Sequence, residues 1–306
     1  MPFWKSIIYL LFISFSLSAQ NHKTDSLKQE LSSAESDSSK AEILCELALH
    51  YSRQQDTENS LKYANKALEL SLKINFLLGA AKAYNIRGNL FSLMADNSEM
   101  LNNFIKAENL YQKIGHKKGL SETYINIAGV YHRTGKDSIA LSYMDKSKKI
   151  AEELGDSLNI AILINAEGVI YHSSGNFKKA LEKMLKAGEI LEKLNNEFAK
   201  MNIYLSIGLS YFDLSDYSNS INYCNKCLEK SKKLGSLQYH IESLNCIIKS
   251  KINSKNMNPS SEVDSLIKLT DLTDEHTIRN TAFSVIKSYF ESIGDYKKAY
   301  KYSLLH

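Results

Sequence analysis

The amino-acid sequence repeats with a period of 40 residues, and this repeat constrains the fold more than any other feature. We call the residues at one equivalent position of successive repeats a column. One column is aromatic, and a column of small residues lies three positions before it. An aliphatic column and a second column of small residues follow later in the repeat. The members are Tyr51, Phe91, Tyr131, Tyr171 and Tyr211; Ala48, Gly88, Ala128, Gly168 and Gly208; Leu61, Leu101, Leu141, Leu181 and Ile221; and Ala67, Ala107, Ser147, Ala187 and Cys227. Internal repeats of this length predict a stack of similar structural units.

The repeat over residues 158–194 shows what one unit contains. Ile160, Leu163 and Ile164 have the three-and-four spacing that places side chains on one face of a helix. Gly175 and Asn176 predict a turn, because glycine accepts a positive φ after a helix end and asparagine caps the next helix. A second stripe follows at Phe177, Ala180, Leu181, Met184, Leu185 and Ala187. Each repeat is therefore a pair of amphipathic helices, and neighbouring repeats must cover its second face.

These residues resemble the tetratricopeptide repeat, with its small-x-x-aromatic first helix, turn glycine, aromatic-x-x-Ala-Leu start of the second helix and later buried alanine. The usual period is about 34 residues, so we expect each helix here to be nearly a turn longer. The proline that often closes the second helix is absent. The resemblance covers residues 40–305 and implies an all-α, right-handed superhelical solenoid of antiparallel helix pairs, with about six to seven repeats. It places in the repeat core Tyr51, Phe91, Tyr131, Tyr171, Tyr211, Gly88, Gly168, Gly208, Ala180 and Ala187.

Four segments are expected along the chain. Residues 1–19 form a signal peptide, residues 20–37 an N-terminal capping helix, residues 38–236 five regular repeats, and residues 237–306 a degenerate sixth repeat with an incomplete last one. Lys251 replaces the aromatic residue of the sixth repeat, and residues 253–262 replace its turn. In the last helix, Ala299, Tyr300, Ser303 and Leu304 form an apolar side without a following helix. Either this helix packs atypically, or the chain is part of a longer protein.

The first 19 residues have the pattern of a secretory signal. Lys5 precedes an apolar run from Ile7 to Leu17, and small residues follow it. The run is shorter than the ~20 residues that a membrane-spanning helix needs, so we expect cleavage near Gln20 and an exported protein, periplasmic or secreted. An uncleaved segment that anchors the protein in the inner membrane is the alternative. Outside this segment we expect no membrane contact.

The charge of the chain argues against a nucleic-acid partner. The sequence holds 38 basic and 34 acidic residues, and removal of the signal segment takes away one basic residue. A nucleic-acid surface requires a much larger basic excess.

The cysteines are more typical of packing than of chemistry. Cys224 and Cys227 form a CxxC motif, but the motif falls in the middle of a helix and not in a βαβ unit. Both positions belong to buried columns, so we expect core packing. A redox or metal role, with Cys246 as the nearest extra partner, is the alternative. Cys45 stands alone, and four cysteines in 306 residues do not make a disulfide scaffold.

No motif supports catalysis or a cofactor. The eight histidines form no HExxH motif and no zinc spacing with cysteine. Ser284 and Lys287 match SxxK, but the partner motifs of acyl-transfer enzymes are absent. We therefore expect a protein that is not an enzyme and that holds no metal or cofactor.

The remaining candidate is a binding surface. In arrays that this sequence resembles, the first helix of each pair lines an inner, concave groove. Polar residues on that helix, away from its packing stripe, are the candidates for peptide binding, because an amide both donates and accepts hydrogen bonds. They are Asn85, Asn89, Asn126, His132, Arg133, Asn165, His172 and Asn245. A solvated position is the alternative for each of them, and for His132 and His172 in particular.

Two functions follow as hypotheses. The first is a noncatalytic, exported scaffold that binds a protein or peptide partner. The alternative, suggested by the similarity of 40-residue versions to the repeat regions of bacterial histidine kinases and helix-turn-helix regulators, is the sensor fragment of a truncated signalling protein.

Overall fold

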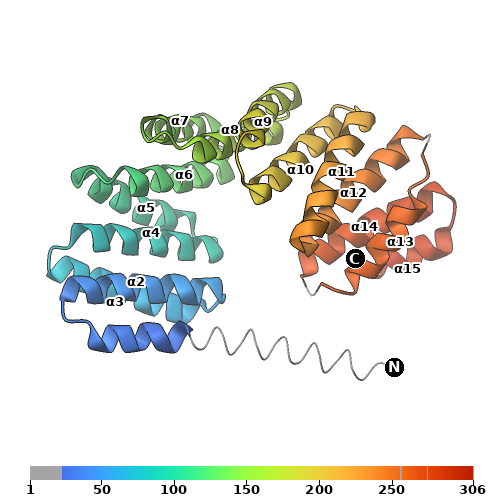
Figure 1. The fold of residues 1–306 in the computed structure, drawn as a ribbon. Helices are drawn as coiled ribbons and strands as arrows, with labels where there is room; N and C mark the ends of the chain where they lie inside the picture. Colours follow the sequence, from blue (N-terminus) through green and yellow to red (C-terminus); the bar gives the residue numbers. More distant parts are fainter. Residues whose placement is uncertain (1–22, 256, 274, 306) are drawn as a thin grey trace, which may run out of the picture. The chain divides into compact units, whose positions relative to one another are not determined.

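A computed structural model describes residues 23–255, 257–273 and 275–305, and within these residues all regular secondary structure is helical (Figure 1). The predicted signal peptide lies outside the described residues. The first helices of seven successive pairs are α2 (Asp37–Arg53), α4 (Leu77–Leu93), α6 (Lys117–Arg133), α8 (Ser157–Ser173), α10 (Glu197–Asp213), α12 (Leu237–Ser254) and α14 (His276–Ser292). The second helices are α3 (Thr57–Lys73), α5 (Asn97–Lys113), α7 (Asp137–Glu153), α9 (Phe177–Glu192), α11 (Tyr217–Leu234), α13 (Ser260–Thr270) and α15 (Tyr296–Ser303). The predicted all-α solenoid of helix pairs is confirmed.

The 40-residue period arises from two equal halves. Most helices have 17 residues, and a three-residue turn such as residues 54–56 follows each of them. The middle residue of these turns has a positive φ, as Gly175 does at 79°. The next residue caps the following helix, and Asn176 accepts a hydrogen bond from the Lys179 N–H as the sequence predicts. Longer helices than in the usual repeat therefore account for the longer period.

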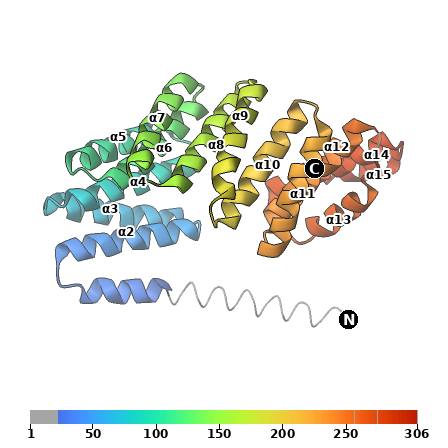
Figure 2. The same cartoon turned by 45° about the horizontal axis from the view of Figure 1, so that its top comes forward.

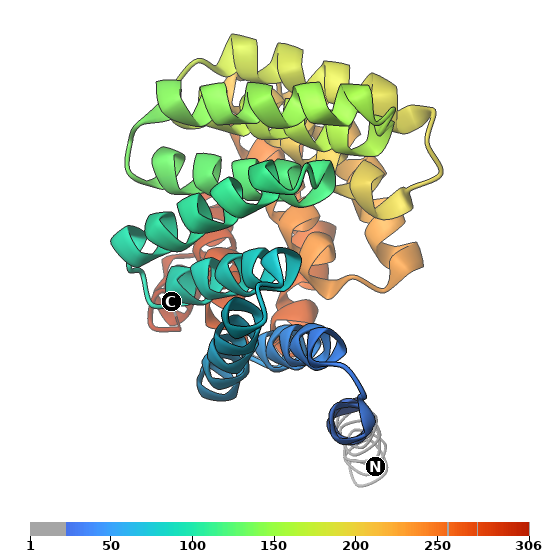
Figure 3. The ribbon, with the colours of Figure 1, turned by 90° about the vertical axis from the view of Figure 1, so that its left-hand side faces the viewer.

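The described residues form two compact units, divided between Ile150 and Ala151. In the first unit, α2 to α6 contact one another in chain order (Figure 3). In the second unit, α8 to α12 lie side by side in the same way, and α13 to α15 follow (Figure 2). A single hydrophobic cluster runs through the second unit from Ala161 to Tyr302, whereas several smaller clusters fill the first. Each helix pair thus packs on its neighbours in the chain, which is the organisation of a solenoid.

Small residues let the two helices of a pair approach closely, as expected. A Cβ atom added to Gly208 on α10 would lie 2.4 Å from Cys224 Sγ on α11. Equivalent contacts exist at Gly88 and Gly168, and Ala180 and Ala187 are fully buried. The prediction for the aromatic column is only partly right, because Tyr51 is buried but Phe91, Tyr131, Tyr171 and Tyr211 are half-buried. These four rings lie near the ends of their first helices, at the same place as Tyr51 on α2.

The two ends of the array differ from the regular repeats. Within the predicted capping segment, residues 23–33 are helical and residues 34–36 are not, and Leu27 is buried against Leu47 and Tyr51. In the sixth pair, α12 ends at Ser254 and α13 begins at Ser260, so the irregular stretch lies where the sequence predicts it. On α15, Ala299 and Tyr302 are buried and Tyr300 is 66% exposed, and Leu304, directly after the helix, is 69% exposed. The expected uncovered side therefore excludes Ala299. No helix in the described residues is long and apolar enough to cross a lipid bilayer.

Candidate functional site

The first unit has a groove across three first helices, α2, α4 and α6, which we call the first groove. It has a volume of about 710 Å³. Its walls carry charges of both signs, and the carboxylate of Glu42 on α2 accepts a hydrogen bond from Lys82 Nζ on α4 at 3.2 Å. The groove residues are Glu42, Cys45, Glu46, Leu49, Lys82, Asn85, Ile86, Asn89, Tyr111, His116, Lys118, Gly119, Glu122 and Asn126. Three predicted site residues, Asn85, Asn89 and Asn126, therefore come together here.

Asn85 is the most informative residue of the first groove. Its side chain is 91% buried on α4, and its Oδ1 has no hydrogen-bond partner among the described residues. A buried amide oxygen without a partner costs about 1–3 kcal/mol. A ligand N–H that enters the groove and donates to this oxygen would recover that cost.

A smaller pocket of about 290 Å³ lies in the second unit, and we call it the second pocket. It is formed by α8 and α10 with the end of α9, and its lining contains no charged residue: Ala161, Ile162, Asn165, Leu191, Asn196, Phe198, Ala199, Asn202 and Ile203. Asn165 Nδ2 donates to Asn202 Oδ1 at 3.3 Å, and Asn202 Nδ2 donates to the Tyr239 hydroxyl at 2.7 Å. These bonds link α8, α10 and α12 in one polar ladder. Asn165 Oδ1 is buried and has no hydrogen-bond partner among the described residues.

The other predicted site residues do not line these cavities. His132 Nδ1 is 2.7 Å from Asp137 Oδ1, and His172 Nε2 is 2.5 Å from Asp213 Oδ2. Both imidazole rings are about one-third exposed, and each is paired with a carboxylate that is also about one-third exposed. Arg133 donates through both terminal nitrogens to Ser92 Oγ at 3.3 Å. These three residues connect elements of the fold at the ends of the first helices.

Asn245 is buried on α12, and its Oδ1 is also without a hydrogen-bond partner among the described residues. It contributes to neither cavity. The sequence analysis instead expects Asn245 on the polar side of its helix, away from the packing stripe, so its burial is a difference between the expectation and the structure.

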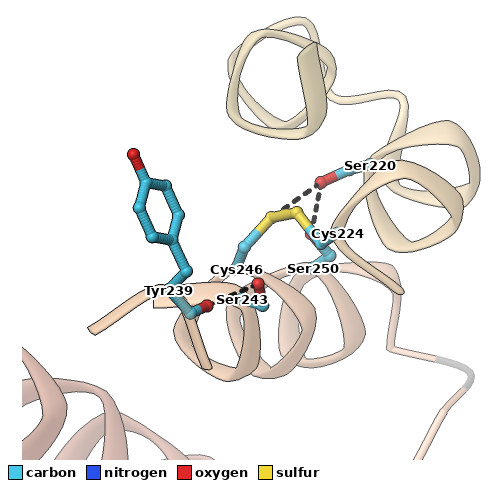
Figure 4. Close-up of a disulfide and its surroundings, with 6 residues drawn as sticks. All are labelled: Ser220, Cys224, Tyr239, Ser243, Cys246 and Ser250. Atoms are coloured by element: carbon cyan, nitrogen blue, oxygen red, sulfur yellow. Dashed lines mark hydrogen bonds between the residues drawn. A yellow bond between two sulfur atoms is a disulfide. The ribbon is translucent and has the colours of Figure 1, made fainter. Parts of the chain in front are cut away.

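Two of the cysteines form a disulfide that the sequence analysis does not predict. Cys224 on α11 and Cys246 on α12 form a disulfide with an S–S distance of 2.08 Å (Figure 4). Ser220 Oγ lies 3.4 Å from Cys246 Sγ and 2.8 Å from Ser250 Oγ, so the Ser220 hydroxyl links the disulfide to Ser250. The burial predicted for Cys224 and Cys227 is confirmed, but the two cysteines of the CxxC motif do not pair with each other.

The two free thiols are unreactive in this environment. Burial raises the pKa of Cys45 to about 12 and that of Cys227 to about 11. A thiol is nucleophilic only as the thiolate. Neither cysteine is therefore suited to redox or acyl-transfer chemistry. Within the described residues there is also no group of three His, Cys, Asp or Glu side chains that could hold a metal ion.

The structure also reveals an alternation that the 40-residue columns conceal. Tyr63, Tyr143 and Tyr223 follow each other at 80 residues on the second helices, and each stacks on the aromatic column, with ring centroids 5.3 to 5.8 Å apart. The repeats between them carry Asn103 and Lys183 at this position. The amide column alternates in the opposite phase, with Asn85, Asn165 and Asn245 separated by Ile125 and Leu205. Tabulation of the sequence at 80 residues would have revealed this pattern.

Comparison with protein-family models gives matches to the tetratricopeptide repeat. One model matches residues 119–193, and another matches residues 41–73 and 202–232. These segments coincide with the regular helix pairs. A comparison with curated protein sequences finds no match.

Several solved structures share the fold at low sequence identity. The apo form of the quorum sensor NprR from B. thuringiensis aligns with a TM-score of 0.69 and 14% identity, over 97% of this chain and 83% of that one. A signal transduction ATPase with a tetratricopeptide repeat sensor from Pyrococcus horikoshii gives 0.71 and 16%, over 91% of this chain and 43% of that one. A Rap protein in complex with Competence and Sporulation Factor gives 0.60 and 15%, over 91% and 77%. The family-model matches show that the chain contains tetratricopeptide repeats, and the solved structures show that its fold is similar to the repeat regions of signalling proteins.

Proposed function

We propose that this protein is an exported, noncatalytic scaffold that binds a protein or peptide partner through the inner faces of its helix pairs. The observation that carries the proposal is the first groove, because three first helices line it and Asn85 presents to it a buried oxygen without a partner among the described residues. The volume of about 710 Å³ falls in the range of ligand sites. Mixed charges and amides on the walls suit a peptide, which carries backbone donors and acceptors as well as side chains.

The likeness to the Rap protein in complex with Competence and Sporulation Factor supports the same proposal, since that protein holds its partner on a related fold. Catalysis finds no support in the cavities. The first groove lacks a nucleophile with a lowered pKa, because burial raises the pKa of its only thiol, Cys45. We therefore assign binding and not turnover to this surface.

Binding is tested by selection of peptides from a phage-displayed random library on the folded chain. Asn85→Leu removes the amide at similar size, and Asn102→Leu on α5 is the matched control, because Asn102 is exposed and outside the groove. We expect the affinity of selected peptides to fall about tenfold in Asn85→Leu, which corresponds to one lost hydrogen bond of about 1.4 kcal/mol, and to stay unchanged in the control. Equal binding by both variants would exclude the first groove, and a library without binders would exclude peptide recognition.

Export is the second part of the proposal. The signal-like pattern of residues 1–19 supports it, and so does the buried Cys224–Cys246 disulfide, because structural disulfides persist mainly in oxidising compartments. The test is N-terminal sequencing of the protein from its native cells after cell fractionation. A mature start near Gln20 in the envelope or medium fraction supports export, whereas full-length protein in the cytoplasmic fraction argues against it.

The alternative function is the sensor part of a longer signalling protein. The likeness to the ATPase with a tetratricopeptide repeat sensor favours it, since this chain aligns with 43% of that one. Sequencing of the gene beyond the codon for His306 separates the two functions. An in-frame kinase, ATPase or DNA-binding domain supports the alternative, and an immediate stop codon supports the scaffold.

A further inference from the structure

The second pocket differs from the first groove in the chemistry of its walls. Its lining has no charged side chain, whereas the first groove has Glu42, Glu46, Glu122, Lys82 and Lys118. Two large apolar side chains stand at its edge, and Ile162 on α8 is 44% exposed while Phe198 on α10 is 61% exposed. The Phe198 ring meets the Tyr239 ring edge to face, with centroids 5.6 Å apart. Exposed apolar side chains around a pocket indicate a binding surface, because a ligand that covers them removes apolar area from water.

The polar ladder beside these residues has a defined direction. Asn165 gives its N–H to Asn202, and Asn202 gives its N–H to the Tyr239 hydroxyl. This arrangement leaves an acceptor at one end, Asn165 Oδ1, which has no partner among the described residues. At the other end, the Tyr239 hydroxyl accepts from Asn202 and still has its own O–H to donate. A ligand that only donates or only accepts hydrogen bonds would bond to one end of the ladder and not to the other. An extended peptide satisfies both, because each of its residues carries one N–H and one C=O.

The size and neutrality of the pocket limit which peptide side chain fits. A volume of about 290 Å³ lies at the lower limit for small-molecule sites and suits one large side chain. A lysine or glutamate side chain would lose its hydration here without an opposite charge to replace it. A leucine, isoleucine or phenylalanine side chain would instead cover Ile162 and Phe198.

We infer that the second pocket selects an extended peptide segment by one bulky aliphatic or aromatic side chain, while Asn165 and Tyr239 hold the backbone on either side of it. This inference rests on the proposed peptide-binding function and adds the class of side chain that the second unit recognises. The first groove, with its mixed charges, does not share this selectivity.

The probe is a positional-scanning library of N-acetylated, C-amidated hexapeptides, in which one position is fixed and the others are randomised, applied to the full chain. We expect sub-libraries with fixed leucine, isoleucine or phenylalanine to be retained at least tenfold more than those with fixed alanine, lysine or glutamate. No preference among the fixed residues would overturn the inference.

Ile162→Glu tests the location. A carboxylate at the pocket edge should abolish the preference for apolar residues and raise the retention of the lysine sub-library several-fold. Val169→Glu is the matched control, because Val169 lies two helical turns further along α8, is 43% exposed and does not line the pocket. Thermal unfolding of both variants verifies their fold. A preference that survives Ile162→Glu, or that Val169→Glu also removes, would contradict the inference.

Asn165→Leu tests the backbone contact and separates the two proposals. It should lower the retention of all sub-libraries by a similar factor, because the backbone is common to them. If the apolar preference disappears in Asn85→Leu and persists in Ile162→Glu, the preference belongs to the first groove, and only the inference fails. If the chain retains no peptide at all, the proposed function and the inference both fail.

Discussion

Cys224 on α11 and Cys246 on α12 are joined by a disulfide, so the second helix of one pair is covalently bound to the first helix of the next. Neither cysteine of the pair bonds to Cys227, although Cys227 lies one helical turn from Cys224.

The first prediction concerns the number of reactive thiols. The chain has four cysteines, and the two free ones, Cys45 and Cys227, are buried with a raised pKa. We expect slow reaction of the native, unreduced protein with Ellman's reagent, two thiols per chain in denaturant, and four after reduction. Four thiols in unreduced, denatured protein would show that the disulfide does not form.

The second prediction concerns the contribution of the disulfide to stability. It closes a loop of 22 residues, and the chain-entropy model gives about 3 kcal/mol for a loop of this length. We therefore expect reduction to lower the free energy of unfolding of the second unit by about 2–4 kcal/mol. The Cys224→Ala/Cys246→Ala variant is the control, since its unfolding in urea should not respond to the reductant.

The third prediction compares two glycines within helices. Gly208→Ala would bring a methyl group within 2.4 Å of Cys224 Sγ and 3.3 Å of the Cys224 backbone nitrogen, so we expect a loss of about 1–3 kcal/mol. Gly129→Ala meets nothing within 4 Å, and the higher helix propensity of alanine should stabilise the protein by up to about 1 kcal/mol. Urea unfolding measures both changes. Equal effects of the two substitutions would mean that close helix approach does not explain Gly208.

The fourth prediction concerns the ion pair between α8 and α9. Lys183 Nζ lies 2.6 Å from Glu167 Oε2, and the Glu167 side chain is 7% exposed. Lys183→Met removes a charged donor from a buried carboxylate, so we expect a loss of about 1–3 kcal/mol. A double-mutant cycle with Glu167→Gln should recover part of this loss, because the amide no longer requires a positive neighbour. Additive effects would show that the two side chains do not interact.

The fifth prediction concerns stability at mild acid. Burial, helped by nearby Lys232, lowers the pKa of His240 below its ordinary value of 6.5. Above pH 6.5 the histidine is neutral in both states and has no effect. As the pH falls from 6.5 towards the folded-state pKa, the unfolded chain takes up the proton first, and the folded state loses stability. Below the folded-state pKa this contribution is constant. Urea midpoints between pH 7.5 and pH 4.5 should fall less in His240→Gln than in the parent protein.

The repeat pattern could predict the helices and their ends, because both depend on local chemistry. Gly175 and Asn176 show the reason: a residue that accepts a positive φ and a residue that caps the next helix recur at fixed positions. Asn85 lines the first groove and Asn165 lines the second pocket, and both belong to the polar positions that the same periodicity picks out on the first helices. The protein-family models then agree with the predicted family over residues 41–73, 119–193 and 202–232.

The repeat pattern could not predict which side chains on neighbouring helices touch, because it relates equivalent positions of the repeats and not positions in contact. Asn165 bonds to Asn202 and Asn202 to Tyr239, each 37 residues later, whereas His172 meets Asp213 at 41 residues. These offsets depend on how far adjacent first helices slide past each other, which only packing determines. The Cys224–Cys246 disulfide has the same origin, since its formation requires two particular helix faces to meet.

The alternation of tyrosine stacks and amides sets the step by which such an array can grow or shrink. Tyr63, Tyr143 and Tyr223 mark one kind of repeat, and Asn85, Asn165 and Asn245 mark the other. Duplication or excision of 80 residues would therefore join every helix pair to a neighbour of its native kind. Duplication or excision of 40 residues would preserve every helix and turn but would place two repeats of the same kind next to each other. The structural unit of this array is therefore a pair of repeats.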